Sequence, residues 1–183
     1  MSDNHPAYKI RFARPEEIPS IIELMRPYNM HHIPSPEMGA LDYKCFIVAE
    51  QNGTLIGAAG YTFVSADIGK TTLMAVNPDY TGYGLGMELQ ARRMQILRGL
   101  GCAKIITNAD RPQTIAWYKR HFGYREIGKL PKIHSFGLND VPAWTTLEAD
   151  LTGIKPVPPS REKLLINAAL TGMKHRKREN SHL

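Results

Sequence analysis

The sequence predicts a mixed α/β fold (α+β), with a mostly antiparallel, twisted central sheet of about six to seven strands flanked by helices. Short apolar or alternating runs of strand length recur between residues 8 and 149. A hairpin signal, Gln51-Asn52-Gly53, joins two of these runs. Two helical segments lie among the later strands without the regular strand–helix alternation of a parallel sheet.

The expected elements follow in order along the chain. An alternating strand at 8–13 leads into a helix that opens at Arg14-Pro15-Glu16-Glu17, because proline suits a first turn and the acids face the positive end of the helix dipole. Segment 27–40 contains three prolines and is expected to be a loop or short helix. The other strands are expected at 45–49, 55–64, 71–76, 104–107, 124–127 and 145–149, and the other helices at 85–98 and 112–122.

One domain is expected over residues 8–151, because 183 residues suffice for a single sizeable core and a short appendage. The appendage, 152–183, begins as a proline-rich linker and continues as a short amphipathic helix and a basic tail. The apolar stripe of this helix must rest on the domain or on a second subunit; it consists of Leu164, Leu165, Ala168 and Ala169. We therefore expect a homodimer formed through the C-terminal helix.

The net charge of +6 is concentrated near the end of the chain, where residues 174–178 read Lys-His-Arg-Lys-Arg. Such a cluster is typical of a solvated chain end, or of a contact with nucleic acid or a membrane surface. The rest of the domain is nearly balanced in charge, which argues against a dedicated nucleic-acid binder.

Composition also bears on the compartment. No apolar run approaches the about 20 residues that a membrane span requires, and residues 1–6 lack the apolar stretch of a signal peptide. Cys45 and Cys102 lie far apart, beside apolar segments and outside any metal-ligand spacing. We expect buried thiols in a reducing cytoplasm, with no membrane segment and no metal site.

A glycine-rich loop, Thr81-Gly82-Tyr83-Gly84-Leu85-Gly86, separates the strand ending at Val76 from the next helix. Glycine lets the backbone approach a ligand closely, and the amides of such a loop and of a helix N-terminus favour a phosphate group. The alternative is a turn that only lets the strand and helix pack. The loop lacks the Gly-x-Gly-x-x-Gly spacing of a dinucleotide site and the Gly-Lys-Ser/Thr of a Walker loop.

The residues around this loop carry a wider resemblance. Val76-x-Pro-x-Tyr80, then Gly-x-Gly, a long helix and Trp117-Tyr-Lys-Arg-His-Phe-Gly-Tyr124 resemble the GNAT family of N-acetyltransferases over about residues 8–150. The resemblance implies acetyl-CoA as co-substrate and transfer of its acetyl group to a primary amine. The family's loop reads Gln/Arg-x-x-Gly-x-Gly/Ala, so Thr81 departs from its first position.

The resemblance also implies which residues contact the co-substrate. The loop from Thr81 to Gly86 would hold the pyrophosphate, and the main chain of Met74, Ala75 and Val76 would pair with the pantetheine arm. Strand 104–107 would be the second of a splayed pair of strands, with the acyl chain between them. Arg111 occupies a position where the family often has asparagine, and Asn108, just upstream, is the candidate to replace it.

Tyr118 is the candidate catalytic residue, because it matches the tyrosine that many family members place beside the leaving thiolate. A phenol can protonate the coenzyme A sulfur as the tetrahedral intermediate collapses. The alternative is a tyrosine that packs on the cofactor arm without transferring a proton.

No general base is assigned. Strand 71–76 contains no carboxylate, which leaves Glu50 or a water molecule as the open alternatives. His31, His32 and His134 lie in the loops bordering the acceptor pocket of this fold, and each is better interpreted as an exposed or structural histidine.

The acceptor pocket would be framed by residues 28–37 and 130–142, the second long enough to act as a lid. Neither segment carries the dense acidic patch expected for a polyamine or a lysine-rich histone tail. We therefore expect a small metabolite amine, such as an amino sugar or amino acid derivative. The alternative function is a non-catalytic module that binds acyl-CoA or a partner protein.

Overall fold

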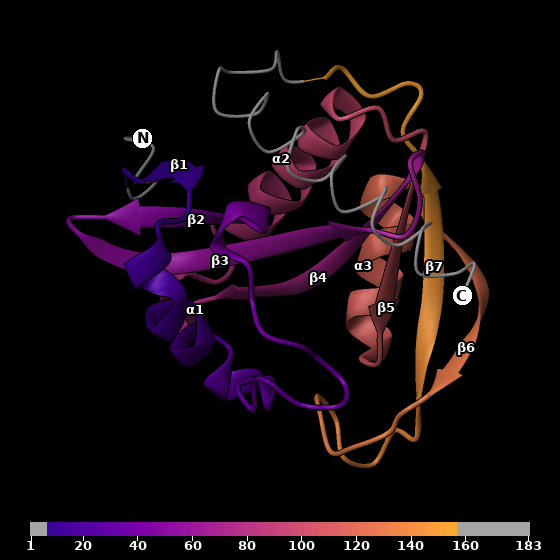
Figure 1. Cartoon of the computed structure of the whole chain (residues 1–183), viewed down its shortest axis with the longest axis horizontal. Helices are drawn as coiled ribbons and strands as arrows, with labels where there is room; N and C mark the ends of the chain where they lie inside the picture. Colours follow the sequence, from indigo (N-terminus) through magenta and orange to yellow (C-terminus); the bar gives the residue numbers. More distant parts are fainter. Residues whose placement is uncertain (1–6, 157–183) are drawn as a thin grey trace, which may run out of the picture.

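The computed structural model describes residues 7–156. A seven-stranded sheet in the order β1-β2-β3-β4-β5-β7-β6 crosses the molecule (Figure 1). The strands are β1 (Lys9–Phe12), β2 (Phe46–Gln51), β3 (Thr54–Phe63), β4 (Ile68–Val76), β5 (Lys104–Ala109), β6 (Arg125–Pro131) and β7 (Ala143–Asp150). Among these described strands only β4 and β5 pair in parallel, so the predicted mixed α/β class with a mostly antiparallel sheet is confirmed.

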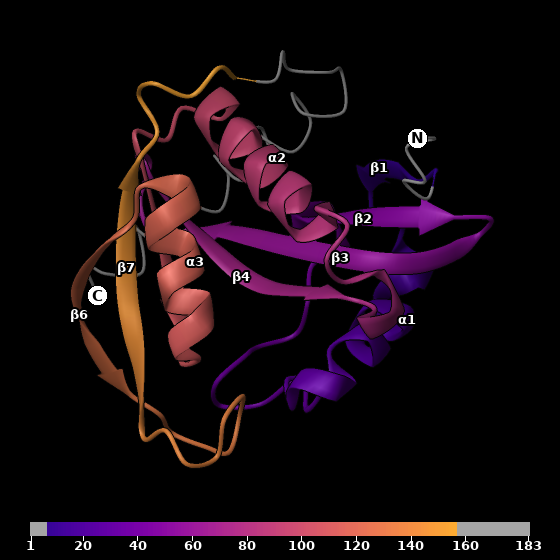
Figure 2. The same cartoon turned by 180° about the vertical axis from the view of Figure 1, so that it is seen from behind.

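Helices cover both faces of the sheet. Helix α1 (Ile18–Leu24) lies on one face, and α2 (Leu85–Gly99) and α3 (Pro112–Phe122) lie on the other (Figures 1 and 2). The larger apolar core, between the sheet and the helix pair, is built around Leu89, Leu97 and Ile105. A second core beneath α1 includes Ile21, Leu73 and Trp144.

Local sequence explains where the helices begin and end. Helix α3 starts at Pro112, whose missing amide is no loss in a first turn, and ends at Gly123, which adopts a positive φ of 66°. The expected first helix starts instead as a short 3-10 turn, Pro15–Glu17, and continues as α1. Glu17 accepts a hydrogen bond from the backbone amide of Arg14 at 2.7 Å and so closes that turn.

Several strands are longer than predicted, β4 and β6 most of all, because cross-strand pairing extends them. Strand β4 begins at Ile68 rather than Thr71, since Gly69 pairs with Phe63 of β3 and with Ile105 of β5. Strand β6 continues beyond Ile127 to Pro131. An edge strand tolerates proline because, on its outer side, no neighbouring strand needs a hydrogen bond from a backbone amide.

A bulge in β4 reverses which of its side chains face each side of the sheet. Ala59 pairs with Met74 and Tyr61 with Thr71, so two β4 residues, Thr72 and Leu73, lie opposite the single residue Gly60. A Cβ atom at Gly60 would lie 2.3 Å from the Thr72 hydroxyl oxygen, so this close approach requires glycine.

Strands β4 and β5 separate after a short paired stretch. Their ladder is confined to residues 68–70 of β4 and 104–106 of β5. The Thr71 hydroxyl donates a hydrogen bond to the Thr107 hydroxyl at the point where the strands part. Beyond this point β5 pairs only with β7. The edge of residues 72–76 that faces β5 therefore has no strand partner among the described residues, while their other edge pairs with β3. This is the splayed pair that the family resemblance implies.

Most of the appendage expected after residue 151 lies outside the described residues. This applies to the amphipathic helix, its apolar stripe, the basic tail and the homodimer contact assigned to them. Within residues 7–156, no helix has both the length and the hydropathy needed to cross a bilayer.

Candidate active site

The loop Thr81–Gly86 joins the end of β4 to the start of α2. Gly82 and Gly84 have φ values of 87° and 83°, and open space surrounds the position where either would carry a Cβ atom. Gly84 is the N-cap of α2, so the first amides of the helix, which have no acceptor within the helix, follow directly. The arrangement provides a row of amides suited to an anion.

Two side chains of the loop play a structural part. The Thr81 hydroxyl donates a 2.8 Å hydrogen bond to the carbonyl oxygen of Pro78 and closes a 3-10 turn. Leu85 is 2% exposed and packs in the core, so only its backbone is available to a ligand. Tyr83 is 47% exposed at the loop surface.

A cavity of about 250 Å³ occupies the gap between β4 and β5; we call it the strand-gap cavity. Five residues predicted from the sequence line it: Met74, Ala75, Val76, Asn108 and Tyr118. The remaining lining residues are Tyr28, Met30, Thr72, Leu73, Thr107, Ala109, Asp110, Arg111, Thr114, Gly137 and Trp144.

The backbone of β4 faces this cavity at alternate residues. Tyr28 donates a 2.7 Å hydrogen bond to the carbonyl oxygen of Val76, which shows that Val76 directs its polar groups away from β3. Because the direction alternates along a strand, Met74 directs its polar groups to the same side, and those of Ala75 point toward β3. Asn108 on β5 accepts a 3.0 Å hydrogen bond from Thr146.

Tyr118 reaches the cavity from α3 and is 5% exposed. Its ring packs against those of Trp117 and Tyr124, each with a centroid separation of 5.0 Å. Its phenol oxygen accepts a 3.3 Å hydrogen bond from the guanidinium of Arg93, a buried residue of α2. The tyrosine is therefore held in one position within the wall.

A second cavity, of about 220 Å³, lies on the α1 side of the gap; we call it the loop-side cavity. It shares Met30, Thr72, Leu73, Asn108 and Trp144 with the strand-gap cavity, so the two adjoin. Lys70 lines the loop-side cavity, and within residues 7–156 no ion pair or hydrogen bond engages its ammonium group. This cavity therefore carries an available positive charge.

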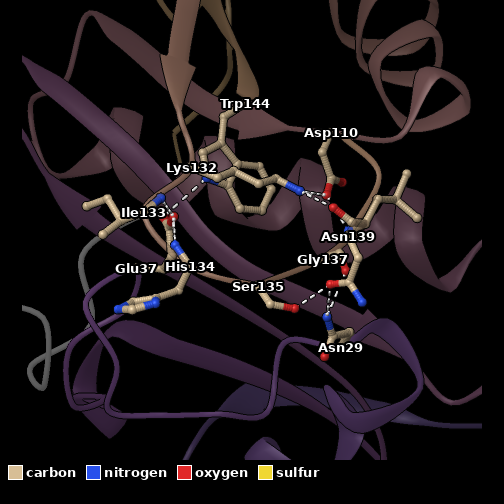
Figure 3. A network of polar contacts seen from close by, with 11 residues as sticks. Asn29, Glu37, Asp110, Lys132, Ile133, His134, Ser135, Gly137, Asn139 and Trp144 are labelled. Atoms are coloured by element: carbon tan, nitrogen blue, oxygen red, sulfur yellow. Dashed lines mark hydrogen bonds and ion pairs between the residues drawn. The ribbon is translucent and has the colours of Figure 1, made fainter. Parts of the chain in front are cut away.

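Glu37 fastens loop 132–142 to the segment that follows α1 (Figure 3). Its carboxylate accepts hydrogen bonds from the amides of Ile133 and His134 and from the indole of Trp144, the last at 3.2 Å. Burial raises the pKa of Glu37, but these hydrogen bonds and the charge of Lys132 outweigh it and hold the pKa below its ordinary value. Glu37 is thus an ionised structural anchor.

A buried ion pair joins the start of the same loop to its middle. Lys132 donates to the Asp110 carboxylate at 2.7 Å and to the carbonyl oxygen of Leu138 at 2.6 Å, and its ammonium lies 4.5 Å from the Trp144 ring centroid (Figure 3). The amide of Leu138 donates to the same carboxylate at 2.7 Å. Asn29 adds a 2.9 Å hydrogen bond to the carbonyl oxygen of Gly137. The segment considered as a possible lid is therefore held at residues 132–134 and 137–138, where it forms part of the wall of the two cavities.

Comparison with known proteins agrees with this architecture. The model of the acetyltransferase (GNAT) family matches residues 16–124. The chain belongs to the GNAT family.

The amino-acid acetyltransferases that match this GNAT chain are larger proteins. An amino-acid acetyltransferase of Pseudomonas aeruginosa is 30% identical over 128 residues, a match that covers 67% of this chain and 29% of the relative. The match therefore spans less than a third of the length of these curated relatives.

Solved structures show the same fold. N-acetylglutamate synthase from Neisseria gonorrhoeae, complexed with coenzyme A and N-acetyl-glutamate, superposes with a TM-score of 0.63 at 27% identity, covering 79% of this chain and 35% of that one. An acetyltransferase from Bacillus cereus gives a TM-score of 0.64 at 19% identity, covering 79% of this chain and 99% of that one.

The residues considered as general base in this GNAT chain are not brought to the cavities. Glu50 is paired with Arg11, which donates to it at 2.8 Å through Nε, and it lines neither cavity. His31 stacks on His32 with ring centroids 4.0 Å apart, and His134 is exposed. The two carboxylates that do line the cavities, Glu37 and Asp110, are both committed to the loop network.

Two features of this site were not predicted from the sequence. Arg93 recurs at four-residue spacing with Leu89 and Leu97, so its place on the apolar face of α2 was a detectable signal. Lys70 had no such signal, because only the β4 bulge and the fold of loop 132–142 bring it to a cavity.

A larger cavity of about 860 Å³ between α1 and the β2–β3 turn contains neither Tyr118 nor the glycine loop.

Proposed function

We propose that this GNAT chain transfers an acetyl group from acetyl-CoA to the α-amino group of an amino acid. One observation carries the proposal: two adjoining cavities meet at the gap between β4 and β5, with Tyr118 lining one and Lys70, which has no partner among residues 7–156, lining the other. The names of its relatives, amino-acid acetyltransferase and N-acetylglutamate synthase, support the same acceptor class.

The residues present fit acetyl-CoA as a substrate. The amides of Gly82 to Gly86 and the start of α2 suit its pyrophosphate, and the backbone polar groups of Met74 and Val76 suit the amides of the pantetheine arm. Thr81 contributes to the turn rather than to the phosphates. In this proposal the loop binds through its backbone, which the change from Gln or Arg to Thr leaves intact.

The proposed reaction is a direct transfer. The amine nitrogen forms a bond to the thioester carbonyl carbon, and the carbonyl π electrons move onto oxygen. As the intermediate collapses, an electron pair of the oxyanion re-forms the carbonyl and the C–S electron pair passes to sulfur, which takes the Tyr118 proton to leave as the free thiol. The amine releases its own proton to water, because Glu37 and Asp110 are occupied by hydrogen bonds, and Tyr118 is reprotonated from water.

Calorimetric titration with acetyl-CoA, followed by a thiol-release assay on a panel of amino acids, tests the proposal. We expect one-site micromolar binding and turnover on at least one amino acid. Saturable binding without turnover on any amine would favour the non-catalytic acyl-CoA-binding module instead. No binding at millimolar acetyl-CoA would contradict both functions.

Replacing Lys70 with methionine should raise KM for the amino acid about 10- to 100-fold, because a charged hydrogen bond to its carboxylate is lost. The KM for the corresponding amino acid amide, which lacks that charge, should change little. Lys129→Met is the matched control, since Lys129 is exposed on β6 and lines neither cavity. Equal changes for the acid and the amide would show that Lys70 does not bind the carboxylate.

We also propose that the protein is a cytoplasmic homodimer. Burial raises the pKa of the Cys45 thiol to about 11, and Cys102 is buried, which suits a reducing compartment. The dimer prediction rests on the apolar stripe of residues 164–169. Light scattering should give twice the chain mass for the full chain, and the mass of one truncated chain after truncation following Ile154. An unchanged oligomer after truncation would contradict a contact through this helix.

A further inference from the structure

Arg93 is a buried arginine that has no counter-ion within residues 7–156. It projects from the middle of α2 and is 0% exposed. Its Nη1 atom donates to the carbonyl oxygens of Gly60 and Leu73, at 3.0 and 3.4 Å, and its Nε atom donates to Gln90 at 3.1 Å. Its Nη2 atom donates to Gln90 Oε1, to the Met74 sulfur at 3.5 Å and to the Tyr118 hydroxyl at 3.3 Å.

All of these partners are neutral. Within residues 7–156, no carboxylate forms an ion pair with Arg93. The carbonyl oxygens of Gly60 and Leu73 lie at the β4 bulge, so one role of Arg93 is to satisfy acceptors there. That role needs donors but not a permanent charge. A buried cation without a counter-ion stabilises negative charge that develops beside it.

The direction of the Arg93–Tyr118 hydrogen bond decides what Tyr118 can do. A guanidinium has only donors, so Tyr118 is the acceptor in this pair, and its single hydrogen remains for another group. Among the described residues, no hydrogen bond uses that hydrogen. Tyr118 lines the strand-gap cavity, so a ligand in that cavity is the available acceptor.

We propose that Arg93 is a positioning residue for Tyr118: it holds the phenol as a donor toward the strand-gap cavity, and its charge stabilises the phenolate left after the proton passes to the departing sulfur. The proposal rests on the proposed acetyl transfer. No proton leaves Arg93, and the phenolate is reprotonated from water after the thiol departs.

The test compares Arg93→Met and Arg93→Lys with Arg92→Met, in the wild-type and Tyr118→Phe backgrounds. Arg92 is the matched control because it is the adjacent, exposed arginine of α2. We expect Arg93→Met to lower kcat about tenfold, with KM for acetyl-CoA nearly unchanged, and to have less than about a twofold effect once Tyr118 is phenylalanine. Arg93→Lys, which keeps a charge, should retain more activity than Arg93→Met.

Two outcomes would overturn the proposal: an unchanged kcat in folded Arg93→Met, or the same loss of kcat with and without the Tyr118 hydroxyl. The second result would mean that Arg93 only supports the bulge. If Arg93→Met does not fold, the same background comparison is made with Arg93→Lys.

A binding measurement separates this proposal from the proposed function. Calorimetry with coenzyme A and with desulfo-coenzyme A, which lacks the sulfur, needs no turnover. Wild type and Arg92→Met should prefer coenzyme A about threefold or more, because Tyr118 donates to its sulfur. Tyr118→Phe and Arg93→Met should lose that preference. Its retention in Arg93→Met would refute the positioning role, whether or not an amino acid acceptor is found.

Discussion

Replacing Tyr118 with phenylalanine should lower kcat by about 100-fold or more while KM for acetyl-CoA changes by less than about twofold. The ring would keep its packing against Trp117 and Tyr124, so the cavity wall should remain intact. The lost group is the hydroxyl that would protonate the leaving sulfur. Steady-state kinetics by thiol release, with calorimetric acetyl-CoA binding alongside, measures both quantities.

Tyr61→Phe is the matched control for the loss of a buried phenol hydroxyl. Tyr61 is 2% exposed, donates to the carbonyl oxygen of Lys44 at 3.3 Å and lines neither cavity. Burial raises its pKa above the ordinary tyrosine value, so it is neutral like the residue that replaces it. The Tyr61→Phe variant should be less stable than the wild type but should have the same kcat. Equal kcat values for Tyr118→Phe and wild type would exclude Tyr118 as the acid.

Replacing Gly84 with valine should weaken acetyl-CoA binding by about 100-fold or more. Gly84 has a φ of 83°, which a β-branched residue adopts only with strain, so the loop amides would be redirected. No atom lies within 4 Å of the added Cβ position, so a clash within the protein is not the cause. Calorimetric titration with acetyl-CoA, at concentrations up to millimolar, measures the loss.

Gly101→Val separates backbone strain from loss of the site. Gly101 has a φ of 93°, its added Cβ would also lie in open space, and it follows the C-terminal end of α2. Both variants should lose about 1–2 kcal/mol of stability from the left-handed backbone, measured by denaturant unfolding. Only Gly84→Val should lose acetyl-CoA affinity. If the two variants bind equally well, the loop is not the pyrophosphate site.

The glycine loop and the helix that follows it could be predicted because their signals are contiguous. Gly82 and Gly84 adopt the positive φ values that mark a backbone open to other residues only with strain, and α2 begins directly after them. The position of Tyr118 was predicted in the same way, since Pro112 and Gly123 bound its helix locally. The predicted strand ends were less accurate, because pairing with neighbouring strands, rather than local residues, extends β4 and β6.

Arg93 shows where a local pattern stops being sufficient. Its spacing from Leu89 and Leu97 places it on the buried face of α2, but a long cationic side chain on such a face can also extend to solvent. Its burial depends on the β4 bulge, which exposes the carbonyl oxygens of Gly60 and Leu73 as acceptors. That bulge is a property of the register between two strands, so the sequence of either strand alone does not predict it.

By itself, the sequence determined the fold class, the position of the glycine loop and the helix that carries Tyr118, because each depends on residues a few positions apart. The tertiary structure alone decided that β4 and β5 part at Thr71 and Thr107. It also decided that Lys70 lines a cavity without a partner among the described residues, and that the Glu37 carboxylate is occupied by hydrogen bonds to loop 132–142. These outcomes depend on contacts between residues far apart in the sequence. Strand β5 stays paired with β7 along its whole length but leaves β4 after residue 106, and the resulting gap is where the two cavities meet.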